Sequence, residues 1–302
     1  MKKYCLLSFL AFLWLQSASA QQDAQYTQYM FNTLVINPAY AGSREAVSIL
    51  GIYRNQWTGF DGSPTSIAVS VHSPVGEKLG LGLFLEADKI GIHQRISAYS
   101  SYAYKIAVGS GYLSLGLQAG VLQYTSDWSE LPDVLDPDDP NFAEDNSKIL
   151  PNFGLGLYYY TEQFFIGASV PHLLDSSLDG VSELGRYEKH YWVTGGVAIP
   201  LNESLKVQPS FLVRAVPSVA PVNIDANVSL IINDIFRVGA GYRSSQAALF
   251  MLEFQQDKLR IGYSYDLDLS GLADQHSGTH EIMVGLDLPT NKLQKVQSPR
   301  FF

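Results

Sequence analysis

Apolar and polar side chains alternate with a period of two along most of the chain. In residues 79–85 every odd position is leucine, whereas the even positions are Gly80, Gly82 and Phe84. The same alternation runs through residues 113–121 and 259–267. A period of two places successive side chains on opposite faces of a β-strand, so the pattern predicts an all-β chain. A soluble β-sandwich would show the same period, so the period alone does not identify a barrel.

The number and length of these segments favour a barrel. We count fourteen, with centres near residues 51, 69, 83, 100, 118, 155, 167, 195, 209, 227, 239, 251, 263 and 284. We expect strands of about 9 to 12 residues, close to the 9–11 with which a tilted strand crosses a bilayer. A single-chain bacterial barrel requires an even number of strands.

The polar faces and the strand ends point the same way. The polar faces carry charged side chains, which suit a wet or plugged lumen and are costly against lipid. They are Arg214, Asp225, Arg237, Arg243, Arg260, Asp266, Glu281 and Asp287. We expect Arg214, Asp225, Arg237 and Arg260 to form a charged network in that lumen. Aromatic residues cluster at strand ends, as in Tyr158–Tyr160, and resemble interfacial girdles. The sequence therefore predicts a fourteen-stranded antiparallel transmembrane β-barrel.

The connections between the predicted strands differ in length. Those after even-numbered strands are tight, whereas three of the others, at Thr125–Ile149, His172–Lys189 and Ser270–His280, are long. Outer-membrane barrels have short periplasmic turns and longer outer loops. This asymmetry predicts that both termini lie in the periplasm.

Residues 1–20 have the pattern of a secretory signal peptide. Lys2 and Lys3 precede an apolar run, and an A-x-A site follows at Ala18–Ala20. Without this leader the chain contains no cysteine, since Cys5 is the only one, and 18 basic residues oppose 29 acidic ones, a net charge near −11. That charge disfavours nucleic-acid binding, and no stretch is apolar for long enough to predict a transmembrane helix.

Candidate catalytic and metal-binding groups are sparse. The six histidines fit no recognisable nucleophile or zinc motif, and a thiol enzyme needs a cysteine, so we expect neither enzymatic activity nor a cofactor. The acidic loop Asp127–Asp145 offers the oxygen ligands that calcium prefers. Its spacing matches no calcium loop, and Pro132, Pro137 and Pro140 favour a solvated surface loop, with calcium as the alternative.

The opening stretch of the mature chain departs from the strand pattern. It has no clear period until Val47, and it is broken at Asn37-Pro38-Ala39-Tyr40-Ala41-Gly42. Pro38 disfavours helical backbone at Asn37, and Gly42 is conformationally permissive. We interpret residues 21–43 as a hatch inside the barrel, because fourteen strands enclose more space than wall side chains fill. The alternative is a turn that only positions the first strand.

The same stretch carries a family resemblance. The motifs QYxxYMFN, INPAYAGS and YRNQW occur in this order, followed by Gly59, Asp61, Gly62 and Pro64. The chain resembles PorP/SprF-type proteins, outer-membrane β-barrels of the type IX secretion and gliding machinery of Bacteroidota. The positions that match the family are Tyr26, Tyr29, Asn32, Asn37, Pro38, Ala39, Tyr40, Gly42, Arg54, Asn55, Gln56 and Trp57.

The resemblance implies a role in secreting cargo that carries a C-terminal sorting domain, or in attaching it to the cell surface. The implied partners are outer-membrane lipid, that cargo and other type IX components, including periplasmic ones, but no nucleic acid. The alternative is a FadL-like conduit for hydrophobic small molecules, a class that is also fourteen-stranded and carries a similar Asn-Pro-Ala in its hatch. A conduit needs an apolar path, whereas the inward faces here are ionic.

The expected organisation of the chain has four parts. Residues 1–20 form the signal peptide, 21–43 the hatch, 44–289 the outer-membrane barrel and 290–302 a periplasmic tail. Pro299 stands three residues before Phe302, so we do not expect the chain to end in a strand.

Overall fold

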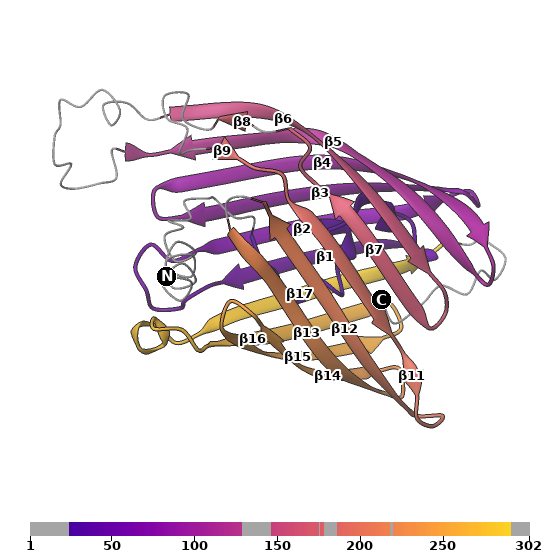
Figure 1. The fold of residues 1–302 in the computed structure, drawn as a ribbon. Coiled ribbons are helices and arrows are strands. Elements are labelled where there is room, and N and C mark those ends of the chain that lie inside the picture. Colours follow the sequence, from indigo (N-terminus) through magenta and orange to yellow (C-terminus); the bar gives the residue numbers. More distant parts are fainter. Residues whose placement is uncertain (1–23, 129–145, 175, 178–185, 218–219, 291–302) are drawn as a thin grey trace, which may run out of the picture.

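Fourteen antiparallel strands form a closed barrel in the computed structural model (Figure 1). The structure describes residues 24–128, 146–174, 176–177, 186–217 and 220–290. The signal peptide, most of the acidic loop and the C-terminal tail therefore lie outside the described residues.

The strands follow one another around the wall in chain order. Their bounds are β1 Ala46–Asn55, β2 Thr65–Val75, β3 Leu79–Ile90, β4 His93–Val108, β5 Gly111–Ser126, β6 Asn146–Tyr160, β7 Phe164–Val170, β10 Tyr191–Val197, β11 Ile199–Pro200, β12 Leu205–Val216, β13 Ala220–Ile232, β14 Phe236–Arg243, β15 Ala247–Gln256, β16 Leu259–Asp268 and β17 Thr279–Pro289. The ring closes because β1 pairs with β17 as well as with β2. Strands β10 and β11 both pair with β12 and occupy one wall position, which gives the predicted fourteen. Two short strands, β8 Ser176–Ser177 and β9 Arg186–Tyr187, pair with each other and form a separate sheet.

Alternation sorts the side chains into two faces. Leu81, Leu83 and Leu85 on β3 point outward and are 43–47% exposed, whereas Phe84 and Glu86, at positions of the opposite parity, are buried inside. A continuous apolar outer surface around a polar interior is the arrangement of a membrane barrel, because lipid covers the outer face. Within the described residues, no helix combines the length and the apolar character needed to span a membrane.

Two expectations about the strands are corrected. Apart from the two-residue β11, lengths of the wall strands range from 7 residues in β7 and β10 to 16 in β4 and β5, instead of 9 to 12. The girdle interpretation of Tyr158–Tyr160 is wrong for two of the three rings. Tyr158 and Tyr160 are 1% and 3% exposed inside the lumen, because neighbours of opposite parity cannot share a face, and only Tyr159 faces outward.

The two mouths of the barrel differ. The connections 56–64 and 269–278 lie at one mouth, the loop side, and the turns 76–78 and 257–258 lie at the other, the turn side (Figure 1). Ala24, the first described residue, lines a cavity at the loop side. Thr290 lies at the turn side, where its hydroxyl bonds the carbonyl of Glu45. The described ends thus lie at opposite mouths, which differs from the expectation that both termini share one side.

Candidate functional site in the lumen

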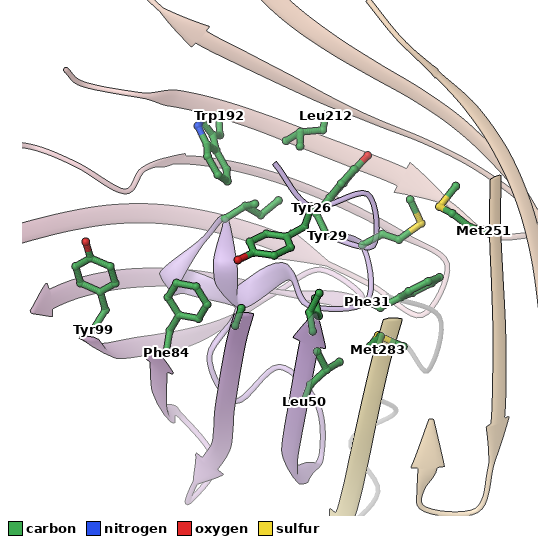
Figure 2. Packing of buried hydrophobic residues seen from close by; sticks show 14 residues of the cluster. Tyr26, Tyr29, Phe31, Leu50, Phe84, Tyr99, Trp192, Leu212, Met251 and Met283 are labelled. Carbon is green, nitrogen blue, oxygen red and sulfur yellow. The ribbon is translucent and has the colours of Figure 1, made fainter. Parts of the chain in front are cut away.

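Residues 24–45, which we call the plug, cross the lumen from the loop side to the turn side. They contain two short 3₁₀ helices, η1 Thr33–Val35 and η2 Pro38–Tyr40. Figure 2 shows Tyr26, Tyr29 and Phe31 of the plug surrounded by Leu50, Phe84, Trp192, Leu212 and Met283 from the wall. Nearly every plug side chain is buried, so the plug fills the lumen where it crosses it.

Glycines on the wall make room for the turn-side part of the plug. A Cβ added to Gly116 on β5 would lie 2.1 Å from the backbone nitrogen of Ala39. One added to Gly80 on β3 would lie 2.0 Å from the Ala41 carbonyl oxygen, and one on Gly156 of β6 would lie 2.0 Å from Asn37 Oδ1. Glycine in a strand often marks such a close backbone approach. The plug therefore rests directly on the wall.

Asn37 and Gly42 fix the path of this part. The Asn37 side chain accepts a bond from the Ala39 amide at 2.9 Å, which caps η2, and donates to the Leu157 carbonyl at 2.8 Å. Pro38 occupies the first helical position, where a missing N–H costs nothing. Gly42 has φ +69°, and its amide donates to His72 Nδ1 at 3.2 Å. These residues explain why the Asn-Pro-Ala…Gly sequence forms this bend.

Charged side chains hold the loop-side part of the plug. Arg54 on β1 donates to Asp266 at 2.9 Å and to Glu281 at 3.1 Å. The Thr27 hydroxyl donates to Asp266 at 2.7 Å, and the Thr27 and Gln28 amides donate to Glu281 at 3.0 and 2.8 Å. These charged groups are at most 4% exposed. Low polarity strengthens such bonds and makes their loss expensive.

The charged residues expected in the lumen all point inward but fall into separate groups. Arg214 pairs with Asp225 at 2.9 Å, and Arg243 links that pair to Asp266 and so to the Thr27 cluster. Arg237 instead lies 3.4 Å from Glu253 and stacks on the Phe31 ring at 4.9 Å. Arg260 binds Asp287 at 3.2 Å and donates to the Phe31 carbonyl at 3.3 Å.

Two tyrosines of the plug act as neutral polar groups. The Tyr26 hydroxyl donates to Glu86 at 2.8 Å, and the Tyr29 hydroxyl accepts from Asn227 at 3.0 Å. Burial, and then the negative charge of Glu86, raise the pKa of Tyr26 well above its usual value. Burial also raises the pKa of Tyr29, which is 2% exposed. Both rings thus favour the protonated form.

A cavity of about 700 Å³, which we call the vestibule, lies above the plug at the loop side. Its floor is formed by Ala24 and Gln25, and Arg54, Trp57, Asp88, Arg95, Tyr124 and Asp268 are among the residues that line it. Trp57 has φ +51°, and its amide donates to the Thr279 hydroxyl at 3.2 Å. This cavity is of a size that holds a small ligand or a short peptide segment.

The structure divides the family-matching residues between the plug and the vestibule. Tyr26, Tyr29, Asn32, Asn37, Pro38, Ala39, Tyr40 and Gly42 lie buried in the plug. Arg54 joins the two groups, because it bonds Thr27 and also lines the vestibule. Asn55 ends β1, and Gln56 and Trp57 line the vestibule.

The expected network left out several lumenal residues. Asp266, Glu281 and Arg243 contact Thr27, and Asp287 pairs with Arg260; these charges were expected on the polar faces, but not as members of the network. Glu253, which pairs with Arg237, was missed. Its inward parity was a readable signal, as was glycine on the inward face of β3, β5 and β6. In the described part of the chain, no group of three or more His, Asp or Glu side chains is arranged to hold a metal ion.

Comparison with known proteins identifies a family model. The model described as "Type IX secretion system membrane protein PorP/SprF" matches residues 18–286. No curated protein matches the chain.

The chain is also similar to solved outer-membrane proteins. The Ralstonia pickettii toluene transporter TbuX is 12% identical with a TM-score of 0.52, over 91% of this chain and 97% of that one. A Pseudomonas aeruginosa FadL homologue is 10% identical with a TM-score of 0.48, over 89% and 95%. The Acinetobacter baumannii outer membrane protein Omp33 is 5% identical with a TM-score of 0.47, over 81% and 98%. At such identities the likeness to TbuX concerns the fold alone.

Proposed function

The chain belongs to the PorP/SprF family of type IX secretion system membrane proteins, and we propose that it acts on secreted cargo proteins as a closed outer-membrane barrel and not as an open pore. The cargo carries a C-terminal sorting domain, and the barrel helps to secrete it or to attach it to the cell surface. Other type IX components, including periplasmic ones, are its further partners. The proposed role is non-catalytic.

The observation that carries this proposal is that the plug is hydrogen-bonded to wall strands on different sides of the lumen. Asn32 accepts from Ser70 on β2 at 2.8 Å, and the Ile36 carbonyl accepts from Ser169 on β7 at 2.5 Å. On the opposite side Tyr29 bonds Asn227 on β13. A solute could cross only if many of these buried bonds broke together, which favours an anchor over an open pore.

Transport of hydrophobic small molecules is the competing function. We consider it because the chain shares its fold with a toluene transporter. Such transport needs an apolar path. Here ion pairs of Arg54, Arg243 and Asp266 line one side of the lumen beside the plug. Burying charge along the route of an apolar solute opposes its passage, so the lumen chemistry supports the cargo role.

Deletion of the gene separates the two functions. We expect one large secreted protein to be retained in the cell or shed into the medium, as measured by surface proteomics. Uptake of toluene and of a long-chain fatty acid should be unchanged. Reduced uptake with an intact set of surface proteins would establish the conduit instead.

We also propose that the loop side faces the cell exterior. Asp61→Cys in connection 56–64 and Glu77→Cys in turn 76–78 place one exposed thiol at each mouth of a mature chain that otherwise has none. An impermeant maleimide added to intact cells should label the first variant and spare the second. An epitope inserted directly before Ala24 should be detected from outside, because Ala24 lines the vestibule. Labelling of the Glu77→Cys variant alone would show that the turn side, and not the loop side, faces the cell exterior.

A further inference from the structure

The vestibule contains two carboxylates, Asp88 and Asp268, that pair with no Arg or Lys of the described residues. Asp88 on β3 accepts a bond from the Ser66 hydroxyl at 2.5 Å, and Arg95, its cross-strand neighbour, donates to Glu86 at 2.9 Å. Asp268 on β16 accepts from the Ser270 amide at 2.7 Å and contacts His276 Nε2 at 3.1 Å. Within the described residues, no Arg or Lys forms an ion pair with Asp88 or Asp268.

The remaining charges of the lining largely neutralise one another. Arg54 and Arg243 share Asp266 at 2.9 and 3.1 Å, and each also binds a second carboxylate deeper in the lumen. Arg95 has Glu86. The charge available to bind a ligand is therefore the negative charge of Asp88 and Asp268. These residues lie on β3 and β16, which are separated by β2, β1 and β17.

Trp57 adds an aromatic surface next to Asp268. The rings of Trp57 and His276 are 6.1 Å apart, and His276 contacts Asp268. The Gly278 amide donates to His276 Nδ1 at 2.9 Å, so Nε2 carries the proton and donates to Asp268. A carboxylate held in place beside an indole face is suited to a guanidinium or ammonium group.

From these features we propose that the vestibule binds an extended segment of a partner polypeptide through its basic side chains. One Arg or Lys is held by Asp268 and Trp57, and a second by Asp88. The inference rests on the proposed function, since it gives the secreted partner a point of contact at the cell surface. The amides and hydroxyls of Gln56, Gln94 and Ser245, which also line the cavity, suit the peptide backbone.

The lining argues against other classes of ligand. A lipid tail requires apolar walls, whereas six charged side chains line this cavity. Nucleic acids and sulfated polysaccharides require an excess of positive charge, whereas the unpaired charge here is negative. A polypeptide with basic side chains satisfies both the carboxylates and the neutral polar groups.

Peptide binding to the purified full-length protein in nonionic detergent tests the proposal. The probe is the capped peptide acetyl-Gly-Arg-Gly-Ser-Gly-Arg-Gly-amide, and its matched control carries citrulline, the uncharged isostere, at both arginines. Isothermal titration should give at least about tenfold tighter binding for the arginine peptide, since charge-assisted bonds are about twice as strong as neutral ones. A peptide with glutamate at both positions should not bind.

Variants locate the site. Asp88→Asn and Asp268→Asn should each weaken binding of the arginine peptide by about five- to tenfold, and Trp57→Leu by about fivefold. Asp274→Asn is the control, because Asp274 is exposed in the same connection as His276 but does not line the vestibule. Unchanged gel mobility without boiling verifies that each variant is folded. Equal binding of the citrulline peptide, or equal loss in Asp274→Asn, would overturn the proposal.

The two proposals fail separately. If gene deletion leaves every surface protein in place while the arginine peptide still binds through Asp88 and Asp268, the vestibule site stands and the cargo role falls. If the deletion strain loses its cargo and the purified protein binds neither peptide, the cargo role stands and the peptide site falls.

Discussion

The two halves of the plug are held by different forces. Residues 33–45, the turn-side half, lie against several wall glycines, and Arg44 also pairs with Asp287 at 3.1 Å, so their fit is mainly one of shape. Residues 24–32, the loop-side half, pack three aromatic rings against the wall, but their backbone and hydroxyl groups are held by Asp266 and Glu281, so charge contributes more to their fit. Close packing tolerates no added volume, whereas a buried ionic cluster tolerates no unbalanced charge.

This division matches what lies beyond each half. The turn-side half leads into β1 and closes the lumen, and Lys105 binds the carbonyl of Gly42 at 3.1 Å at that end. The loop-side half forms the floor of the vestibule through Ala24 and Gln25. We infer that the shape-held half serves the permeability barrier, while the charge-held half supports the surface at which a partner binds.

The largest effect is expected from adding volume to the turn-side half. In Gly116→Leu the new side chain would collide with the backbone of Pro38 and Ala39, so the plug cannot seat. The loss in the free energy of unfolding should exceed the 1–3 kcal/mol typical of overpacking, because a backbone segment cannot relieve the clash by changing rotamer as a side chain can. Planar-bilayer conductance and sensitivity to vancomycin should rise, and the temperature at which the folded gel band is lost should fall.

Gly51→Leu is the matched control for this substitution. Gly51 alternates with the inward Leu50 and Ile52 and so faces lipid, and a Cβ there meets nothing nearer than 4.0 Å. It should behave as the wild type. Unchanged conductance in Gly116→Leu would show that the plug does not close the lumen and that Asn37-Pro38 is only a turn.

The second effect comes from unbalancing charge in the loop-side half. Arg54→Met leaves Glu281, which is fully buried, without its cation, and breaking such a pair costs about 3–5 kcal/mol. Thermal unfolding followed by gel mobility should report the loss. Adding Glu281→Gln should recover part of it, because the unpaired charge is then removed.

An exposed ion pair provides the comparison for Arg54→Met. Lys206, near the start of β12, lies 2.7 Å from Asp234 in the turn after β13, and Asp234 is 50% exposed. Lys206→Met should therefore cost at most about 1 kcal/mol. If Arg54→Met and Lys206→Met cost the same, the lumenal cluster does not hold the plug.

The sequence predicted the wall better than it predicted the lumen. The fourteen strands follow from alternation, which is a local property, and the structure confirms them. The faces of Tyr158–Tyr160 were misassigned because residue type was weighed above parity, although parity decides which side a strand residue occupies. The inward direction of Arg214 and Arg260 was also readable from parity.

The partners of the plug were not readable in the same way. Thr27 meets Asp266 and Glu281, which are 239 and 254 positions away, and this contact depends on how deep the plug sits. Pairing between distant strands is set by barrel closure and stagger, which no single segment encodes. The glycines opposite Asn37 and Ala39 did carry a local signal, because an inward glycine in a strand indicates close approach of another chain segment.

The smallest effect is expected from the phenol proton of Tyr26, which makes the stability of the loop-side half of the plug depend on pH. Burial and Glu86 raise the pKa of Tyr26, so the folded protein keeps its phenol proton above pH 10, where the unfolded chain releases it. The stability that this proton contributes is full below pH 10 and is lost as the pH rises toward the folded-state pKa.

The substitution Tyr26→Phe should lower the free energy of unfolding by about 1.5–3 kcal/mol at pH 8, since a hydrogen bond to a charged group is lost. The variant should also lose less stability than the wild type between pH 10 and 11.5, because it has one ionisable phenol fewer. Tyr102→Phe, on the outer face with Tyr102 56% exposed, is the control at pH 8 and should leave the stability there unchanged. Equal pH profiles for Tyr26→Phe and the wild type would mean that the Tyr26 ring holds the loop-side half by packing, as the turn-side half is held, and not by its hydroxyl.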